Sequence, residues 1–180
     1  TAQVAWNATS GEPLLEERGF RVVPFSALPS DAKERLGDYF MSSIYPVLTP
    51  LVVDPSHPFP FISGASLSLV LTVRADEERR HFARVKVPPN RSRFIDAGDG
   101  AFVRLEDLIE SHLHVLFPGV TIEDSCIIRV LRSSEVGTPG EDAADLLELM
   151  EDTLARRRMA DAVSLELHGD IPEARLRLLL

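Results

Sequence analysis

Apolar residues recur every four positions in the first third of the chain and predict an amphipathic helix. They are Ala32, Leu36, Phe40 and Ile44, which a helix would place on one face. Ser30 is the predicted N-cap, because a serine hydroxyl accepts hydrogen bonds from the free N–H groups at a helix start. A short β-rich run over residues 20–25 precedes this helix. Prolines from position 46 onward predict that the helix ends near Tyr45.

Alternating apolar residues predict strands over residues 65–73 and 82–87, joined into a hairpin by the charged stretch between them. In the second strand one face carries Ala83, Val85 and Val87 and is expected to pack inward. The opposite face carries Phe82, Arg84 and Lys86 and is expected to reach outward. Residues 122–131 and 162–167 are predicted to form two further strands.

Three more helices are predicted. The first covers residues 105–117, with Glu106 and Asp107 in its first turn. The second begins at Thr138, which is followed by a proline and by Glu141 in capping-box positions. The third begins at Asp170 and is expected to be truncated at the end of the chain. Because these helices alternate with strands that include a hairpin, the predicted fold class is α+β: helices packed on a mixed or antiparallel sheet, as a single domain.

A proline-rich segment over residues 44–61 is unusually apolar. Its five prolines are interleaved with valine, leucine and phenylalanine, whereas disordered linkers combine proline with polar residues. The backbone before each proline is pushed into extended conformations. The segment is therefore expected to be stiff, ordered and packed against the rest of the domain.

Composition excludes several classes of protein. The 180 residues are 44% hydrophobic and carry a formal net charge of −9, so binding of nucleic acid by bulk positive charge is not expected. No apolar run approaches the length of about 18 residues that a membrane span needs, and no signal peptide is recognisable. The single Cys126 excludes an internal disulfide. A cytoplasmic location is predicted.

One local basic cluster forms a candidate anion contact. Arg84 and Lys86 share a strand face and would meet an anion together, and Arg91 and Arg93 follow within the same basic stretch. The alternative is an ordinary solvated strand face whose charged side chains bind nothing. We favour this alternative, because the net negative charge of the chain opposes a polyanion.

No catalytic, cofactor-binding or metal-binding residue is predicted. The common glycine-rich phosphate-binding motifs are absent from the sequence, as are paired cysteines and the HExxH zinc motif. His112 and His114 lie two positions apart on a predicted helix, so they should point to different faces and not bind a metal together. His57 is expected to bond a backbone carbonyl and so hold the proline-rich segment in place.

Several motifs resemble those of bacterial polyphosphate kinases, in the order in which that family carries them. The proline-rich segment reads IYPVLTPLVVDPSHPFPF, and FARVKVP, FVRLEDLI, LFPG and DLLE begin at positions 82, 102, 116 and 145. The resemblance implies a structural motif made of Pro46, Thr49, Pro50, Asp54, Pro55, His57, Pro58, Phe59 and Pro60.

The resemblance covers one domain of that enzyme, the head or middle domain. Residues 19–180 are expected to form it, with residues 1–18 as a tail or the remnant of a preceding N-terminal domain. The resemblance implies that the whole enzyme transfers the terminal phosphate of ATP to polyphosphate through a phosphohistidine, with Mg²⁺. None of the five histidines stands in the H-x-K context of the family's catalytic histidine, so this segment is expected to be inactive alone.

The implied role is architectural. It consists of contacts with other domains of the same chain and with the second subunit of a homodimer, and at most a weak contact with polyphosphate. Two alternatives from other classes stay open: a free-standing phosphohistidine hydrolase or phosphotransferase that uses one of its own histidines, and a non-enzymatic binding module of the same fold. The sequence shows no arranged nucleophile, base and anion hole, which weighs against the first alternative.

Overall fold

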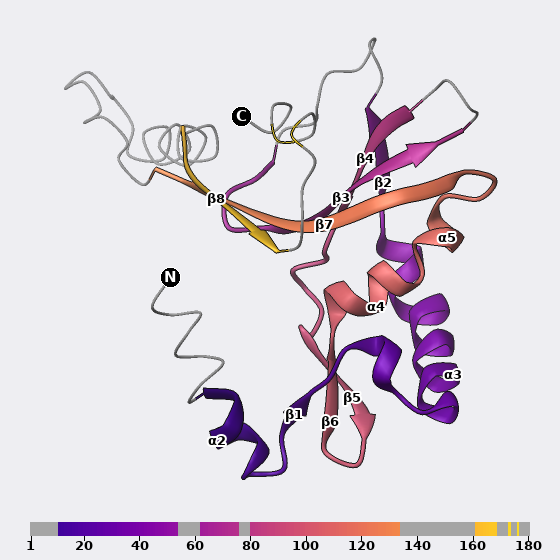
Figure 1. The fold of residues 1–180 in the computed structure, drawn as a ribbon, viewed down its shortest axis with the longest axis vertical. Helices are drawn as coiled ribbons and strands as arrows, with labels where there is room; N and C mark the ends of the chain where they lie inside the picture. The colour runs from indigo at the N-terminus through magenta and orange to yellow at the C-terminus, as the bar shows by residue number, and fades with distance from the viewer. Residues whose placement is uncertain are drawn as a thin grey trace, which may run out of the picture. The chain divides into compact units, whose positions relative to one another are not determined.

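The computed structural model describes residues 11–53, 62–75, 80–133 and 161–168, together with Glu173 and Leu176. Residue contacts divide the chain into two compact units. Unit 1 comprises Thr1–Pro50 and Val87–Ile122, and unit 2 comprises Leu51–Lys86 and Glu123–Leu180. The described strands form a three-stranded and a five-stranded sheet, and Figure 1 shows them together with the helices. This confirms the predicted α+β class.

Unit 1 contains the smaller sheet, in the strand order β1-β6-β5. A short helix α2 (Glu12–Glu16) precedes β1 (Arg21–Val22). β1 pairs in parallel with β6 (Ala101–Arg104), which pairs antiparallel with β5 (Phe94–Gly98), so this sheet is mixed. The predicted strand over residues 20–25 is shorter than expected, because Phe25–Ala27 forms a 3-10 turn after Pro24.

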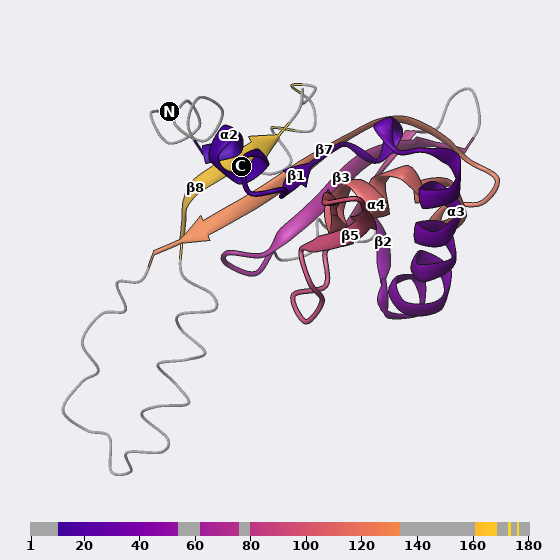
Figure 2. The ribbon, with the colours of Figure 1, turned by 90° about the horizontal axis from the view of Figure 1, so that it is seen from below.

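The helical layer of unit 1 begins with α3 (Ser30–Tyr39), which lies beside α4 (Leu105–Ser111) in both ribbon views (Figures 1 and 2). The α-helix is followed by a π-helical turn, Phe40–Ile44, and by a 3-10 turn, Tyr45–Val47. Ala32, Leu36, Phe40 and Ile44 are all buried, as predicted. The capping prediction was one residue off: Ser30 is the first helical residue, and the N-cap position is the extended Pro29, without a side-chain cap.

The helix predicted over residues 105–117 is broken in two. α4 (Leu105–Ser111) and α5 (Leu113–Leu116) are separated by His112, whose φ of −113° and ψ of 14° lie outside the helical region. The ring nitrogen Nδ1 of His112 lies 2.9 Å from the Leu108 carbonyl oxygen, the acceptor that its own backbone N–H would use in a continuous helix. That N–H bonds the Ile109 carbonyl instead, which tightens the last turn.

Unit 2 contains the larger sheet, in the strand order β2-β4-β3-β7-β8. Figure 2 shows the long β7 running beside β3. The strands are β2 (Pro50–Val53), β3 (Leu67–Arg74), β4 (Arg80–Lys86), β7 (Thr121–Arg132) and β8 (Ala162–His168). β3 and β4 pair antiparallel, as do β7 and β8, which confirms the predicted hairpin and both later strands.

One core cluster of unit 2 lies on one face of this sheet. It contains Ile62, Val70, Cys126, Ile128 and Val130, with Leu165 packed against them. β3 is the central strand, and every residue from Ser68 to Val73 is buried, so both of its faces are covered. Such a strand reads as a nearly continuous apolar run.

The proline-rich segment is described only in part. The helix ends where predicted, and the backbone is extended from Leu48. Ile44 is buried and Pro50 is half-buried, but Pro46 and Thr49 are exposed, so the expectation of a packed segment holds only in part over its described residues. The remaining motif residues (Asp54, Pro55, His57, Pro58, Phe59 and Pro60) lie outside the described residues, as do the helix predicted from Thr138 and most of the one predicted from Asp170. No helix in the described ranges is long and apolar enough to cross a membrane.

Candidate polar and anion-binding sites

Arg84 and Lys86 lie on the same face of β4, as predicted, but their environments differ. Arg84 is only 5% exposed, and its Nε donates to the Ser68 hydroxyl at 3.1 Å. Burial lowers the pKa of Arg84, because a guanidinium away from water is less stable in its charged form. The expectation of a solvated strand face is therefore wrong for Arg84. Pairing through Ser68↔Lys86 places that serine beside β4.

Lys86 at the end of the strand is exposed, as expected. Its Nζ donates to the Ser63 hydroxyl at 3.2 Å. Ser63 in turn lies in a turn with Ser66, whose hydroxyl donates to the Ser63 carbonyl at 2.8 Å. Lys86 is thus a surface cation with one exposed hydrogen bond to a neighbouring turn.

Arg91 and Arg93 belong to unit 1, in the loop before β5. Arg91 donates from Nη2 to the Ser43 carbonyl at 3.2 Å. Arg93 donates from Nε and Nη2 to the same Glu106 oxygen, Oε1, at 3.0 and 2.7 Å. The four predicted anion contacts are thus split between the two units, and each donates a hydrogen bond to a protein group.

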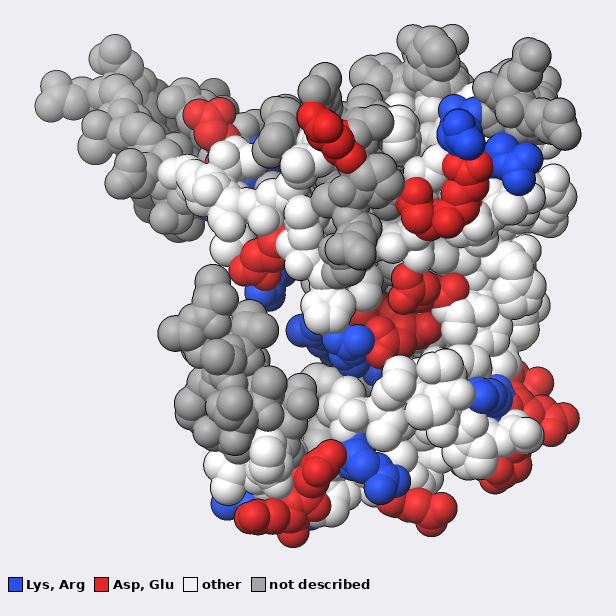
Figure 3. All heavy atoms as spheres, viewed as in Figure 1, with Lys and Arg blue, Asp and Glu red and all other residues white. Residues whose placement is uncertain are grey.

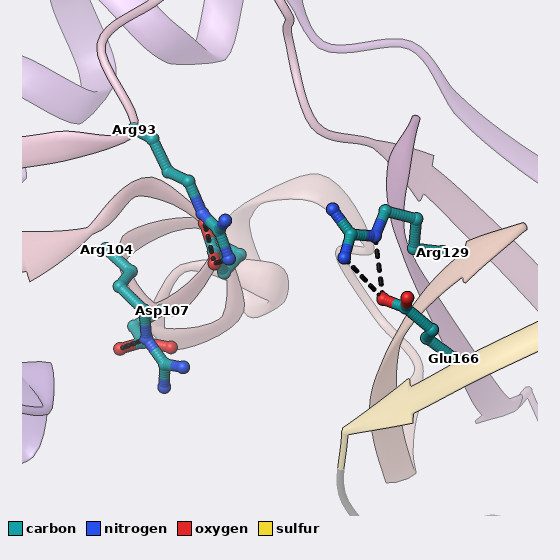
Figure 4. A network of polar contacts seen from close by, with 6 residues as sticks. Arg93, Arg104, Asp107, Arg129 and Glu166 are labelled. Carbon is teal, nitrogen blue, oxygen red and sulfur yellow. Dashed lines mark hydrogen bonds and ion pairs between the residues drawn. The ribbon is translucent and has the colours of Figure 1, made fainter. Parts of the chain in front are cut away.

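The Glu106 carboxylate was missed by the sequence interpretation. It does lie in the first turn of α4, as expected, but its side chain is only 1% exposed, and Oε2 is buried without a hydrogen-bond partner. Asp107 is buried next to it and accepts from Arg104 Nε at 2.9 Å (Figure 4). Burial raises the pKa of Asp107, and the Arg104 hydrogen bond opposes that shift. Arg104 and Asp107 are three residues apart at the start of α4, a spacing from which their ion pair could have been predicted.

Unit 2 carries exposed ion pairs between strands. Arg129 on β7 meets Glu166 on β8, with Nε 2.7 Å from Oε2 (Figure 4). Arg74 and Arg80 both contact Glu123, whose pKa they lower, chiefly through the Arg80 hydrogen bond.

On the face drawn in Figure 3, blue and red side chains stand next to one another, with no extended basic surface among the coloured residues. Such pairing neutralises the cations that a polyanion would need.

His112 packs among aromatic side chains. Its ring stacks on Phe40 with centroids 4.4 Å apart and meets Phe25 edge-on at 5.4 Å. Burial lowers the pKa of His112. The His114 ring lies with its centroid 6.1 Å from that of His112 and is stacked at an interplanar angle of 25°. In the described part of the chain, no three His, Cys, Asp or Glu side chains are grouped so as to hold a metal ion.

Comparison with known proteins identifies the family. The sequence model of the polyphosphate kinase middle domain matches residues 31–180. This chain belongs to that family. The matched range includes parts of both units. The family expected from the motifs is therefore confirmed.

Individual relatives agree with this assignment. Polyphosphate kinase from Mycobacterium ulcerans is 45% identical over 180 residues, covering 93% of this chain and 24% of the relative. The Streptomyces coelicolor polyphosphate kinase is 44% identical over 169 residues, covering 93% of this chain and 23% of the relative. The crystal structure of polyphosphate kinase from Porphyromonas gingivalis matches with a TM-score of 0.69 at 28% identity, over 93% of this chain and 24% of that one. The chain thus spans about a quarter of the length of these polyphosphate kinases.

Proposed function

We propose that this chain acts as the middle domain of a longer polyphosphate kinase, with an architectural role. The whole enzyme would transfer the terminal phosphate of ATP to polyphosphate through a phosphohistidine that lies elsewhere in the polypeptide. ATP and Mg²⁺ would bind those other parts. The two buried carboxylates of the described residues, Glu106 and Asp107, are each paired with an arginine and so are not open to a metal ion. A cytoplasmic homodimer is part of the same proposal.

The pairing of Glu106 with Arg93 is the observation that carries the architectural role. A carboxylate that served as a base or a metal ligand would need an oxygen open to the ligand. Glu106 instead is 1% exposed and accepts from two nitrogens of Arg93, Nε and Nη2, on one oxygen. Its charge holds the start of α4 against the loop before β5, which is a contribution to the fold.

A contact with polyphosphate is a secondary part of the proposal, limited to Lys86 of unit 2 and Arg91 of unit 1, each taken separately. Arg84 is buried and Arg93 is held by Glu106, so neither guanidinium is presented to a polyanion. Lys86 and Arg91 each make one exposed hydrogen bond that a phosphate oxygen could replace. With a net charge of −9 the expected binding is weak and strongly weakened by salt.

Labelling with γ-³²P-ATP tests the proposal. The full-length enzyme should acquire an acid-labile phosphohistidine and synthesise polyphosphate, whereas the 180-residue chain should do neither. Acid-labile label on the isolated chain that is lost in His57→Ala or His114→Ala would contradict the architectural role. A full-length enzyme that makes no polyphosphate would contradict the assignment of the activity.

A further inference from the structure

The π-helical turn Phe40–Ile44 of unit 1 exposes a run of apolar side chains. Phe40 and Ile44 are fully buried at its two ends. Between and after them, Met41 is 48% exposed, Tyr45 40% and Val47 45%. Met41 and Tyr45 are four residues apart and so lie on the same side of the turn. Together with the exposed Pro46 and Val47, these two residues form what we call the Met41–Val47 surface.

Charge is absent from this part of the sequence. Residues 40–53 read FMSSIYPVLTPLVV, without a single Asp, Glu, Lys or Arg, in a chain that is 26% charged. Exposed segments of soluble proteins normally carry charges that keep apolar side chains from associating. Charge depletion together with Met and Tyr is the composition of the central part of a protein interface.

The polar groups of the turn are used internally. The Ser42 hydroxyl donates to the Asp38 carbonyl at 2.8 Å, which is the usual back-bond of a helical serine. The Ser43 carbonyl accepts from Arg91 at 3.2 Å. The Met41–Val47 surface can therefore be covered by apolar atoms without leaving these two groups unsatisfied.

We propose that the Met41–Val47 surface is the docking site for another domain of the same full-length polypeptide. This rests on the proposed function. Polyphosphate kinases such as the Mycobacterium ulcerans relative are about four times as long as this chain, so most of such a polypeptide lies outside it. A covalently linked domain is permanently present at the surface, which fits an uncharged contact of the obligate kind; interfaces that open and close are more polar.

The occupant's expected chemistry is an apolar patch without charged residues. Methionine is unbranched and fits irregular partners. Tyr45 contributes an aromatic body with a polar tip that can bond at the rim. An acidic residue introduced here would be buried without a partner in the assembled enzyme and would remain in water in the isolated chain.

Hydroxyl-radical labelling of Met41 and Tyr45 tests the proposal, in the 180-residue chain and in the full-length enzyme. Both residues should be labelled in the chain and protected by about fivefold or more in the enzyme, as expected for burial in an interface core. Equal labelling of both proteins would overturn the proposal. Protection that disappears on dilution of the full-length enzyme would also overturn it, since a second copy would then be the occupant.

Val47→Asp provides the second measurement, with Leu14→Asp as the matched control. Leu14 is 51% exposed on α2 of the same unit. Val47→Asp should lower the melting temperature of the full-length enzyme and leave that of the isolated chain unchanged, and Leu14→Asp should change neither. An unchanged full-length enzyme would overturn the docking site. Polyphosphate synthesis by the unmodified enzyme, measured alongside, reports separately on the proposed function.

Discussion

Arg93 and Glu106 form a one-sided ion pair at the start of α4. The arginine nitrogens Nε and Nη2 both donate to the single oxygen Oε1, while Oε2 is buried without a hydrogen-bond partner. The Arg93 carbonyl also accepts from the Leu105 N–H at 2.7 Å, so backbone and side chain of one residue hold the same helix end. The pair closes the open end of the β5–β6 hairpin, where Phe94 pairs with Arg104.

The first prediction concerns this pair. Arg93→Met should destabilise the chain by about 1 to 3 kcal/mol, because Glu106 would be left buried without its charged donor. The half-exposed Arg93 side chain places the expected value in the lower part of that range. Urea unfolding monitored by circular dichroism measures the change.

A double variant is the control for this prediction. Arg93→Met combined with Glu106→Leu removes both partners and the unpaired oxygen, and apolar replacement of both members of a buried pair is often nearly neutral. The double variant should therefore be more stable than Arg93→Met alone. Additive losses from the two substitutions would show that the pair is not coupled and that the expected origin of the loss is wrong.

The second prediction separates the two cations of β4. Arg84→Ala should cost about 2 to 4 kcal/mol, because a long side chain that is 5% exposed leaves a cavity when it is truncated. Lys86→Ala, two residues along the same strand face, should cost less than about 0.5 kcal/mol, because Lys86 is exposed. Denaturant unfolding of both variants measures the difference, and equal small losses would place Arg84 in solvent.

Periodicity predicted the elements of this fold far better than it predicted their surroundings. The β3–β4 hairpin and β7 follow from alternating apolar residues, because a strand has a fixed period of two. The same alternation correctly placed Arg84 and Lys86 on one face. It contains no information about whether another layer covers that face, and so the burial of Arg84 could not be predicted.

The features missed in unit 1 depend on contacts distant in sequence. The break at His112 arises where its ring packs on Phe40, more than 70 residues earlier. Glu106 was assigned to the helix dipole, since acidic residues in a first turn are common there. Only the position of Arg93 in the folded chain shows that this carboxylate is buried and paired. Such side-chain environments are set by tertiary packing, which overrides local preferences.

The third prediction is a pH dependence from His112. Its pKa in the fold lies below the ordinary histidine value because of burial, with neighbouring His114 acting in the same direction. As the pH falls, the unfolded chain therefore binds a proton before the folded chain does, and the free energy of unfolding decreases. The loss should begin near the unfolded pKa of about 6.5 and stop below the folded pKa.

His112→Phe tests this assignment. Phenylalanine keeps a ring against Phe40 but cannot be protonated, so the decrease of stability below about pH 6.5 should become smaller. The variant also loses the bond to the Leu108 carbonyl, and a constant loss of about 1 kcal/mol at neutral pH is expected. His168→Gln, at an exposed histidine, is the control. A pH profile equally steep in His112→Phe and in the unchanged chain would assign the dependence to another group.

The last prediction uses two glycines that share a backbone conformation but differ in surroundings. Gly100 has φ +71° in the turn between β5 and β6, and a Cβ there would lie deep inside the contact distance of the Gly19 carbonyl oxygen. Gly119 has φ +77° with nothing near the position of a Cβ. Gly119→Ala should therefore cost only the left-handed backbone strain, about 1 kcal/mol. Gly100→Ala adds a clash with rigid backbone next to the parallel pairing Arg21↔Ala101, so its loss should exceed that of Gly119→Ala by about 1 kcal/mol or more. Thermal and urea unfolding of the two variants measure the difference, and equal losses would mean that β1 moves away from β6 at no cost.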